Sequence, residues 1–259
     1  MFLLNVTRFI RILLILVIVI SPYKLFSKNI DLNYDIEWKT LNIAKLIWSA
    51  NLDDNRYTIK NTILSDGIFS SMYPFELTSQ TNGTIVDESF FPSHFHYISQ
   101  SRKKNKSVSI NFDELGIIND YEIIPKPDDF YIDNFNQLKS QKLFTDPISQ
   151  LFEYFLHQKS SNKTIIDGRR IYDLYAENIE GKTFNENSSI NFKGETLGLK
   201  ITFPYYLSLW KDSKDDKNTI KYVIIYYSAF KNTNIPVQIV LKTNRSKIFM
   251  NLSSYNIVN

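Results

Sequence analysis

The sequence predicts a mainly β fold of the α+β type: a curved antiparallel sheet or half-barrel with one covering amphipathic helix. Many segments alternate apolar and polar residues with the period of two that is typical of half-buried strands. Only residues 146–157 repeat apolar residues at helical spacing. Parallel βαβ units would need a helix between successive strands, so the connections are expected to be antiparallel.

The strands are predicted from this alternation. Tyr34, Ile36 and Trp38 share one face of the first strand, and 43–52 forms a hairpin with 57–64 around Asp53-Asp54-Asn55. The other predicted strands are 69–78, 95–101, 108–112, 121–124, 170–179, 189–192, 197–203, 220–230, 237–243 and 247–255. Residues 125–146 are expected to form an irregular crossing loop.

The predicted helix has a clear start and one apolar stripe. Asp146 is a good N-cap, and Pro147 suits the first helical position because its missing N–H would be unpaired there. The stripe consists of Ile148, Leu151, Phe152, Phe155 and Leu156. His157 ends the helix, where an imidazolium interacts favourably with the helix dipole.

Two arginines follow the helix in the segment Asp167-Gly168-Arg169-Arg170. Asp-Gly favours a tight hairpin turn, from which Arg169 and Arg170 leave on opposite faces of the next strand. An inward guanidinium needs a partner, since an unpaired buried charge is costly. Asp173, Glu177 or the acidic head group of a ligand could fill that role, so a structural ion pair and ligand recognition both stay open.

Residues 1–27 have the layout of a secretory signal peptide. Arg8 and Arg11 precede the apolar run 12–20, and a cleavage site follows Ser27. The run is too short for a permanent membrane span, although an uncleaved N-terminal anchor is the alternative. The mature chain would be one domain, residues 28–259. The abundance of Asn, Ile and Lys suggests an AT-rich bacterium, and therefore a periplasmic protein.

The composition excludes several kinds of chemistry. The chain has no cysteine, so neither disulfides nor thiolate chemistry are available. The formal net charge is +3, and no feature predicts nucleic-acid binding. The basic run 102–106 is expected at the solvated tip of a hairpin; a docking site for anionic lipid or polysaccharide is the alternative.

No catalytic constellation or cofactor motif is apparent, so we expect a protein that is not an enzyme. His94 and His96 would share one face of a strand, but the sequence offers no third ligand at metal-site spacing. No nucleophile elbow or phosphate loop occurs. The acidic pairs fall where turns are expected. Aromatic residues make up 15% of the chain, and they could either fill a core or line a cavity for an apolar ligand.

The order of these features resembles the DUF3108 family of exported bacterial proteins of unknown function, in particular its alphaproteobacterial branch. The matching elements are Tyr34-Asp35-Ile36, Asp66-Gly67-Ile68, Phe91-Pro92-Ser93-His94-Phe95, Asp146-Pro147-Ile148-Ser149, Asp167 to Asp173 and Ile235-Pro236-Val237. Asn42 and Ala44 replace glycines common in the family. The resemblance implies a sheet and helix similar to the LolA/LolB lipoprotein-carrier folds of the periplasm, and it supplies no catalytic residues.

The leading hypothesis is a periplasmic, non-enzymatic binding protein of the cell envelope with a lipid or lipoprotein ligand. Leu151, Phe152 and Phe155 would face the cavity, and Arg169 or Arg170 would contact an anionic head group. The alternative is a structural or assembly factor with a packed core that binds another envelope protein through a sheet edge. A hydrolase acting on envelope polymers is the third hypothesis.

Overall fold

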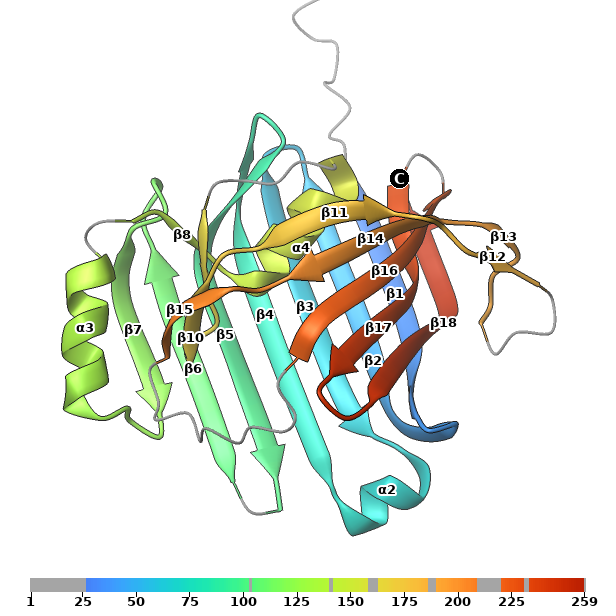
Figure 1. Ribbon diagram of the computed structural model, residues 1–259. Helices are drawn as coiled ribbons and strands as arrows, with labels where there is room; N and C mark the ends of the chain where they lie inside the picture. The colour runs from blue at the N-terminus through green and yellow to red at the C-terminus, as the bar shows by residue number, and fades with distance from the viewer. Residues whose placement is uncertain are drawn as a thin grey trace, which may run out of the picture.

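The computed structural model describes residues 27–102, 104–139, 142–157, 163–185, 190–208, 220–230 and 233–258. Twelve of their strands form one antiparallel sheet that curls into a half-barrel (Figure 1). In spatial order these are β11 (Tyr175–Ile179), β14 (Leu197–Thr202), β16 (Ile220–Phe230), β17 (Thr233–Thr243), β18 (Lys247–Val258), β1 (Ser27–Trp38), β2 (Leu41–Asp53), β3 (Arg56–Ser65), β4 (Phe75–Val86), β5 (Ser89–Ser101), β6 (Asn105–Phe112) and β7 (Ile118–Ile124). The predicted fold class is confirmed, and the sheet is not closed.

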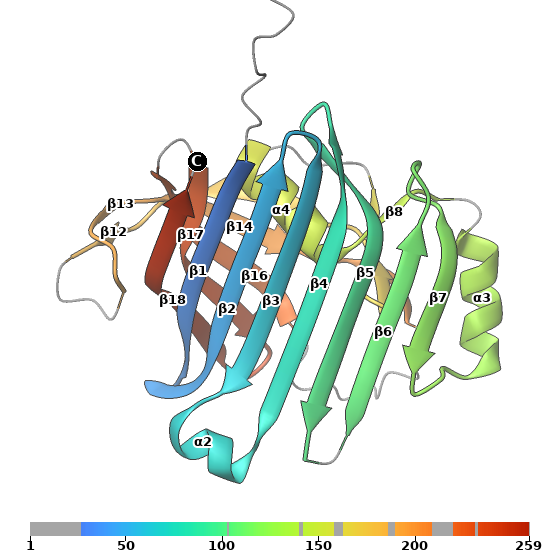
Figure 2. The same cartoon turned by 180° about the vertical axis from the view of Figure 1, so that it is seen from behind.

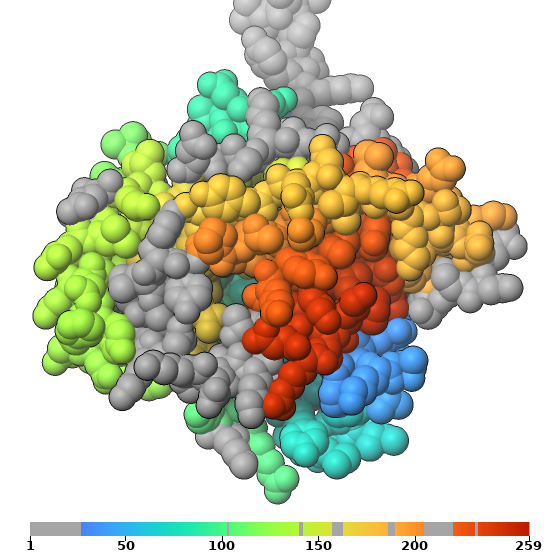
Figure 3. All heavy atoms as spheres, viewed as in Figure 1, coloured from blue at the N-terminus to red at the C-terminus, as the bar shows by residue number. Residues whose placement is uncertain are grey.

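The alternation in the sequence sets which face of each strand is buried. On β1, Ile30, Leu32, Tyr34 and Ile36 all point into the core. The hairpin of β2 and β3 turns where predicted, with Asp53 opposite Arg56. The first strands form a regular wall whose convex side faces outward (Figure 2). In the space-filling view, β14 to β18 lie in front of this wall (Figure 3).

Three helices are present among the described residues, where one was predicted. The predicted helix is confirmed as α4 (Pro147–His157), which lies inside the curve of the sheet. The strand prediction for 69–78 is wrong in its first half, because α2 (Gly67–Met72) precedes β4. The loop prediction for 125–146 is also wrong: α3 (Asp129–Lys139) and β8 (Phe144–Thr145) lie there.

The two corrections have different physical causes. Gly67, the first residue of α2, has φ +57°, which turns the chain out of the sheet at this point. For α3, the prolines Pro125 and Pro127 favoured the prediction of a loop, but both lie before the first residue of the helix. Phe135 of α3 is fully buried and packs edge-on against Tyr121 of β7, with ring centroids 4.9 Å apart. This tertiary contact leaves only a weak trace in the local sequence.

A second, four-stranded sheet lies across the open side of the half-barrel. Its order is β15 (Tyr205–Ser208), β10 (Arg170–Tyr172), β9 (Thr164–Ile166) and β8. β8 and β9 are parallel, joined through α4, so the expectation of purely antiparallel pairing is wrong at this point. The predicted strand 170–179 is split into β10 and β11. The break lies at Asp173, whose amide donates a hydrogen bond to the carbonyl of Pro204. Pro204 has no N–H and cannot donate a hydrogen bond in return, so the ladder is interrupted there.

The hairpin of β11 and β14 extends into a two-stranded sheet, β12 (Thr183–Phe184) with β13 (Gly194–Glu195). The strand predicted at 189–192 is wrong over 190–192, and Ser189 lies outside the described residues. The amide of Asn191 donates one backbone hydrogen bond to the carbonyl of Leu252, but the amide of Phe192 donates to the carbonyl of Ile190 in its own segment.

The predicted signal peptide lies outside the described residues, apart from Ser27. None of the described helices is long and apolar enough to cross a membrane.

Candidate functional site

The N-terminus of α4 is fixed to the sheet by a buried carboxylate. Asp146 is fully buried, and its Oδ1 accepts hydrogen bonds from the amides of Ile148 (2.9 Å) and Ser149 (3.0 Å). Its Oδ2 accepts from the hydroxyls of Thr81 (2.8 Å) and Ser149. The predicted N-cap is therefore confirmed, with two additional bonds. Burial raises the pKa of Asp146 above its ordinary value, and these hydrogen bonds counteract that rise only in part.

The same network reaches two strands of the large sheet. The hydroxyl of Ser149 lies 2.7 Å from Tyr57 Oη on β3 and 3.1 Å from Thr81 Oγ1 on β4. Burial raises the pKa of Tyr57 well above its ordinary value, and the negative charge of Asp146 adds to this effect. Tyr57 stays a neutral phenol that can donate. The network therefore holds the helix in one position over β3 and β4.

A second buried polar contact fixes the middle of α4. Glu153 Oε2 accepts a hydrogen bond from the amide of Phe90 on β5 (2.8 Å). Lys163 donates to the carbonyl of Phe90 (2.7 Å), and its Nζ lies 3.5 Å from Glu153 Oε2 and 3.8 Å from the ring centre of Phe91. Burial lowers the pKa of Lys163, while Glu153 opposes that shift. The ammonium group and the carboxylate thus compensate each other where water is largely absent.

The apolar stripe of α4 packs on the concave face of the sheet. The ring of Trp48 on β2 meets Phe152 edge-on at 4.9 Å and Phe155 at 6.1 Å between centroids. Both phenylalanines are buried, whereas Leu151 is half-buried. Two of the three apolar residues predicted to bind a ligand therefore contact core aromatic rings. Trp48 Nε1 and Asn61 Oδ1, on directly paired residues of β2 and β3, are buried and have no hydrogen-bond partner among the described residues.

The concave face has a second, more open end. Thr81, Phe95 and Ile110 are fully buried beside α4. Further along the same strands and on the same face lie Leu77, Ser99 and Lys106, which form a cross-strand row and are only half-buried. We call this region the open end of the half-barrel. It combines apolar, hydroxyl and cationic side chains.

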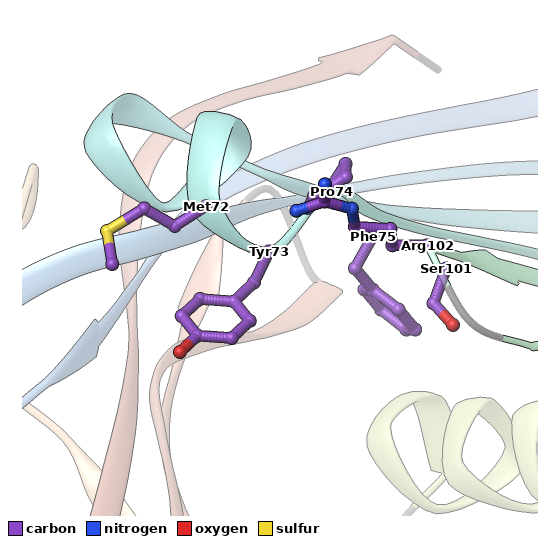
Figure 4. Close-up of a pocket in the computed structure, with 6 residues that line it drawn as sticks. All are labelled: Met72, Tyr73, Pro74, Phe75, Ser101 and Arg102. Atoms are coloured by element: carbon purple, nitrogen blue, oxygen red, sulfur yellow. The ribbon is translucent and has the colours of Figure 1, made fainter.

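A hollow of about 640 Å³ lies at the rim of the open end. It lies between the segment that follows α2 and the turn that joins β5 to β6 (Figure 4). Its lining residues are Met72, Tyr73, Pro74, Phe75, Ser101 and Arg102. Phe75 and Ser101 are a directly paired cross-strand position, so β4 and β5 carry the hollow together. Aromatic surface and a guanidinium group thus share one site.

The predicted Asp-Gly turn is confirmed between β9 and β10. Asp167 Oδ1 accepts hydrogen bonds from the amides of Arg169 and Arg170, both at 2.7 Å. Burial raises the pKa of Asp167, and these two hydrogen bonds and the charges of both arginines oppose the rise. Arg169 is exposed and Arg170 is half-buried. Both hydrogen bonds to Asp167 come from backbone amides and not from guanidinium groups, so the structural ion pair and ligand recognition by Arg169 or Arg170 both stay predictions.

The positive charge of Arg169 influences the pKa values of two residues on β5 and β6, toward the open end. Burial raises the pKa of Tyr97 on β5 to about 12, and the positive charge of Arg169 counteracts part of that rise. Burial also lowers the pKa of Lys106 on β6, and the charges of Arg169 and Lys104 lower it further. Arg169 is therefore close enough to influence both strands, whereas Phe152 and Phe155 lie in the packed end.

Gly168 is required both by its conformation and by its neighbours. Its φ is +82°, and a Cβ there would come within 2.4 Å of the side chain of Val108 on β6. Gly168→Ala is expected to lower the free energy of unfolding by about 3 kcal/mol, the sum of left-handed strain and overpacking. Gly67→Ala is the control, because Gly67 also has positive φ but nothing lies within 4 Å of its Cβ position. Urea titration of both variants measures the difference; equal losses would refute the close contact.

The two histidines share a face of β5, as predicted. Their ring centroids lie 5.2 Å apart, and His94 Nε2 is 3.1 Å from Ser109 Oγ. Burial lowers the pKa of His96, and the charges of His94 and Lys60 add to this effect. A neighbouring lysine disfavours a metal cation. Within the described ranges, no group of three or more His, Asp or Glu side chains could hold a metal ion.

Sequence comparison places the chain in a family. The sequence model of the family described as "Protein of unknown function (DUF3108)" matches residues 33–252. The chain belongs to the DUF3108 family. No curated protein matches it in sequence. Among solved structures, this DUF3108 chain is similar to a "Beta-barrel-like Protein of Domain of Unknown Function DUF1849 from Brucella abortus". The TM-score is 0.47 at 11% identity, covering 91% of this chain and 99% of the other.

Several residues of the DUF3108 site were not identified from the sequence. Tyr57, Thr81 and Lys163 become partners of α4 only through long-range packing. Local signals pointed to the helix cap and the Asp-Gly turn but not to what lies opposite them. Tyr57 begins a predicted strand, whereas Thr81 lies outside the predicted strands. The hollow next to α2 was missed because the segment was predicted to be strand.

Proposed function

We propose that this protein is an exported, non-enzymatic binding protein of the bacterial cell envelope that holds an amphipathic ligand in the open end of its half-barrel. The proposal rests on the difference between the two ends of the concave face. One end is filled by α4, and the other combines exposed aromatic surface with cations and a hollow of about 640 Å³. A volume of that size lies within the range of small-molecule sites.

The chemistry of the open end suggests how the ligand is oriented. Phe75 and Leu77 would contact its apolar part, and Arg102, Lys106 and Arg169 would attract an anionic head group. Phe152 and Phe155 close the inner end of the site in this proposal, and Trp48 Nε1 is available to a polar group that reaches that far. The layout of residues 1–27 supports export, with the periplasm as destination and an uncleaved anchor as the minor alternative.

A titration with a dansylated fatty acid tests this assignment. Leu77→Arg, which fills the apolar floor with a charged chain, is expected to abolish uptake of the probe. Lys106→Gln is expected to weaken binding about tenfold, since a charge-assisted hydrogen bond is lost. Arg56→Gln is the control, because Arg56 is exposed on the β2–β3 turn at the opposite end of the sheet. Unchanged binding in Leu77→Arg would contradict the proposed site.

The open sheet supports a second candidate function, an assembly factor that pairs with a strand of another envelope protein. The twelve-stranded sheet ends at β7 and β11. α3 lies beside β7, whereas β11 carries the exposed Tyr175. Free strand edges of this kind are used for strand addition. If the protein takes up no fatty acyl probe and instead captures an extended envelope peptide at β11, this function replaces the first.

A further inference from the structure

The segment 66–74 leaves the large sheet between β3 and β4 and is held firmly where it leaves. The amide of Phe75 donates to Ser65 Oγ (3.0 Å), and the amide of Asp66 donates to the carbonyl of Ile43 (3.0 Å). Lys45 forms an ion pair with Asp66 at 3.2 Å. The segment, which includes α2, is therefore presented in a defined position at one end of the half-barrel (Figures 1 and 2).

This segment presents large apolar side chains to solvent. Ile68, Met72 and Tyr73 are 77%, 55% and 65% exposed, and no residue of α2 is buried. Leu41, the first residue of β2 after the neighbouring β1–β2 turn, is also exposed. A short helix normally packs its apolar residues inward. Contiguous exposed apolar residues on a soluble domain typically mark a surface that contacts a membrane or another protein.

Cations lie beside these apolar residues. Lys39 projects from the β1–β2 turn, with its Nζ 4.8 Å from the ring centre of Trp38. Arg102 lines the same hollow as Met72 and Tyr73, and Lys104 follows in the same turn between β5 and β6 (Figure 4). The one carboxylate of the segment 66–74, that of Asp66, is paired with Lys45.

We propose that this surface, the α2 rim, docks on a lipid bilayer that contains anionic phospholipid. The α2 rim consists of Leu41, Ile68, Met72 and Tyr73 with Lys39, Arg102 and Lys104. Apolar side chains flanked by cations match the boundary between acyl chains and phosphate head groups. A second copy of the chain fits less well, because a symmetric contact would place the cations of one rim against those of the other.

Docking in this orientation would turn the hollow toward the bilayer. Met72 and Tyr73 belong both to the α2 rim and to the lining of the hollow. An amphipathic ligand could then pass between the membrane and the open end without crossing water. The docking itself does not depend on the proposed ligand, so the two can fail separately.

A site-specific fluorescent label tests the docking on the full chain. The chain has no cysteine, so Met72→Cys can carry a single environment-sensitive nitrobenzoxadiazole dye. Leu115→Cys is the matched control: Leu115 is 66% exposed and lies in the β6–β7 turn at the opposite end of the sheet. Because the chain enters β1 at that opposite end, an interaction of residues 1–26 with lipid would not by itself bring the label at Met72→Cys into a bilayer.

Vesicles of phosphatidylcholine with a quarter phosphatidylglycerol should shift the emission of the label at Met72→Cys to the blue and leave the label at Leu115→Cys unchanged. Adding Ile68→Asp should weaken that response on the order of tenfold, and Arg102→Gln or Lys39→Gln about fivefold each. The exposed Arg56→Gln should have no effect. The proposal is overturned if the label at Met72→Cys does not respond, if both labels respond equally, or if Ile68→Asp responds like the parent.

Discussion

Phe155→Asp is expected to lower the free energy of unfolding by more than about 4 kcal/mol, which is enough to unfold much of the protein at ambient temperature. Phe155 is buried, and its ring lies 6.1 Å from that of Trp48 in the contact between α4 and the sheet. The substitution removes this packing and places a carboxylate in an apolar environment without a partner.

Phe130→Asp is the control for Phe155→Asp. Phe130 also lies on a helix, α3, but is 72% exposed, so the same chemical change there should alter stability by less than about 1 kcal/mol. Urea unfolding followed by tryptophan fluorescence measures both. If Phe155→Asp unfolds at the same urea concentration as the parent, α4 is not packed on the sheet.

Asp146→Ala is expected to cost about 3 kcal/mol or more. It removes the N-cap of α4 and leaves the hydroxyls of Thr81 and Ser149 without their buried acceptor. Asp113→Ala is a close control. Asp113 Oδ1 likewise accepts two backbone amides, those of Leu115 and Ile117, but in a turn that solvent can reach. We expect a cost of about 1 kcal/mol there. Equal costs would mean that the buried network adds nothing to the cap.

The raised pKa of Asp146 also predicts how its contribution depends on pH. A carboxyl whose pKa is higher in the folded than in the unfolded state binds its proton preferentially when folded. The folded state therefore gains stability as the pH falls from above the folded value toward the unfolded value near 3.8. The stability difference between the parent and Asp146→Asn should move in favour of the parent as the pH falls from 7 toward 4. The opposite trend would show that the hydrogen bonds outweigh burial.

What the sequence predicted well was local. The cap at Asp146, the apolar stripe of α4 and the Asp167-Gly168 turn depend on neighbours within a few residues, and all three are confirmed. The hairpin of β2 and β3 was predicted for the same reason. Each signal combines a side chain with a backbone requirement that is satisfied close by.

What the sequence did not predict depends on distant partners. Residues 69–72 of α2 were predicted to be strand because their aromatic and apolar residues resemble a β segment, but no residue of α2 is buried. α3 is anchored by a single buried ring, Phe135. Lys163 is held by Glu153 and by the backbone of Phe90, which lies 73 residues away. The open end exists only because β4, β5 and β6 continue beyond the reach of α4.

The most direct test of the central claim, that the open end holds an amphipathic ligand, is native mass spectrometry with organic extraction. The full chain would be produced in a bacterium, and the protein recovered from the periplasmic fraction. We predict a co-purifying amphipathic molecule at near-stoichiometric amounts in the parent and its loss in Leu77→Arg. A clean mass without ligand, together with no uptake from added envelope lipids, would contradict the account.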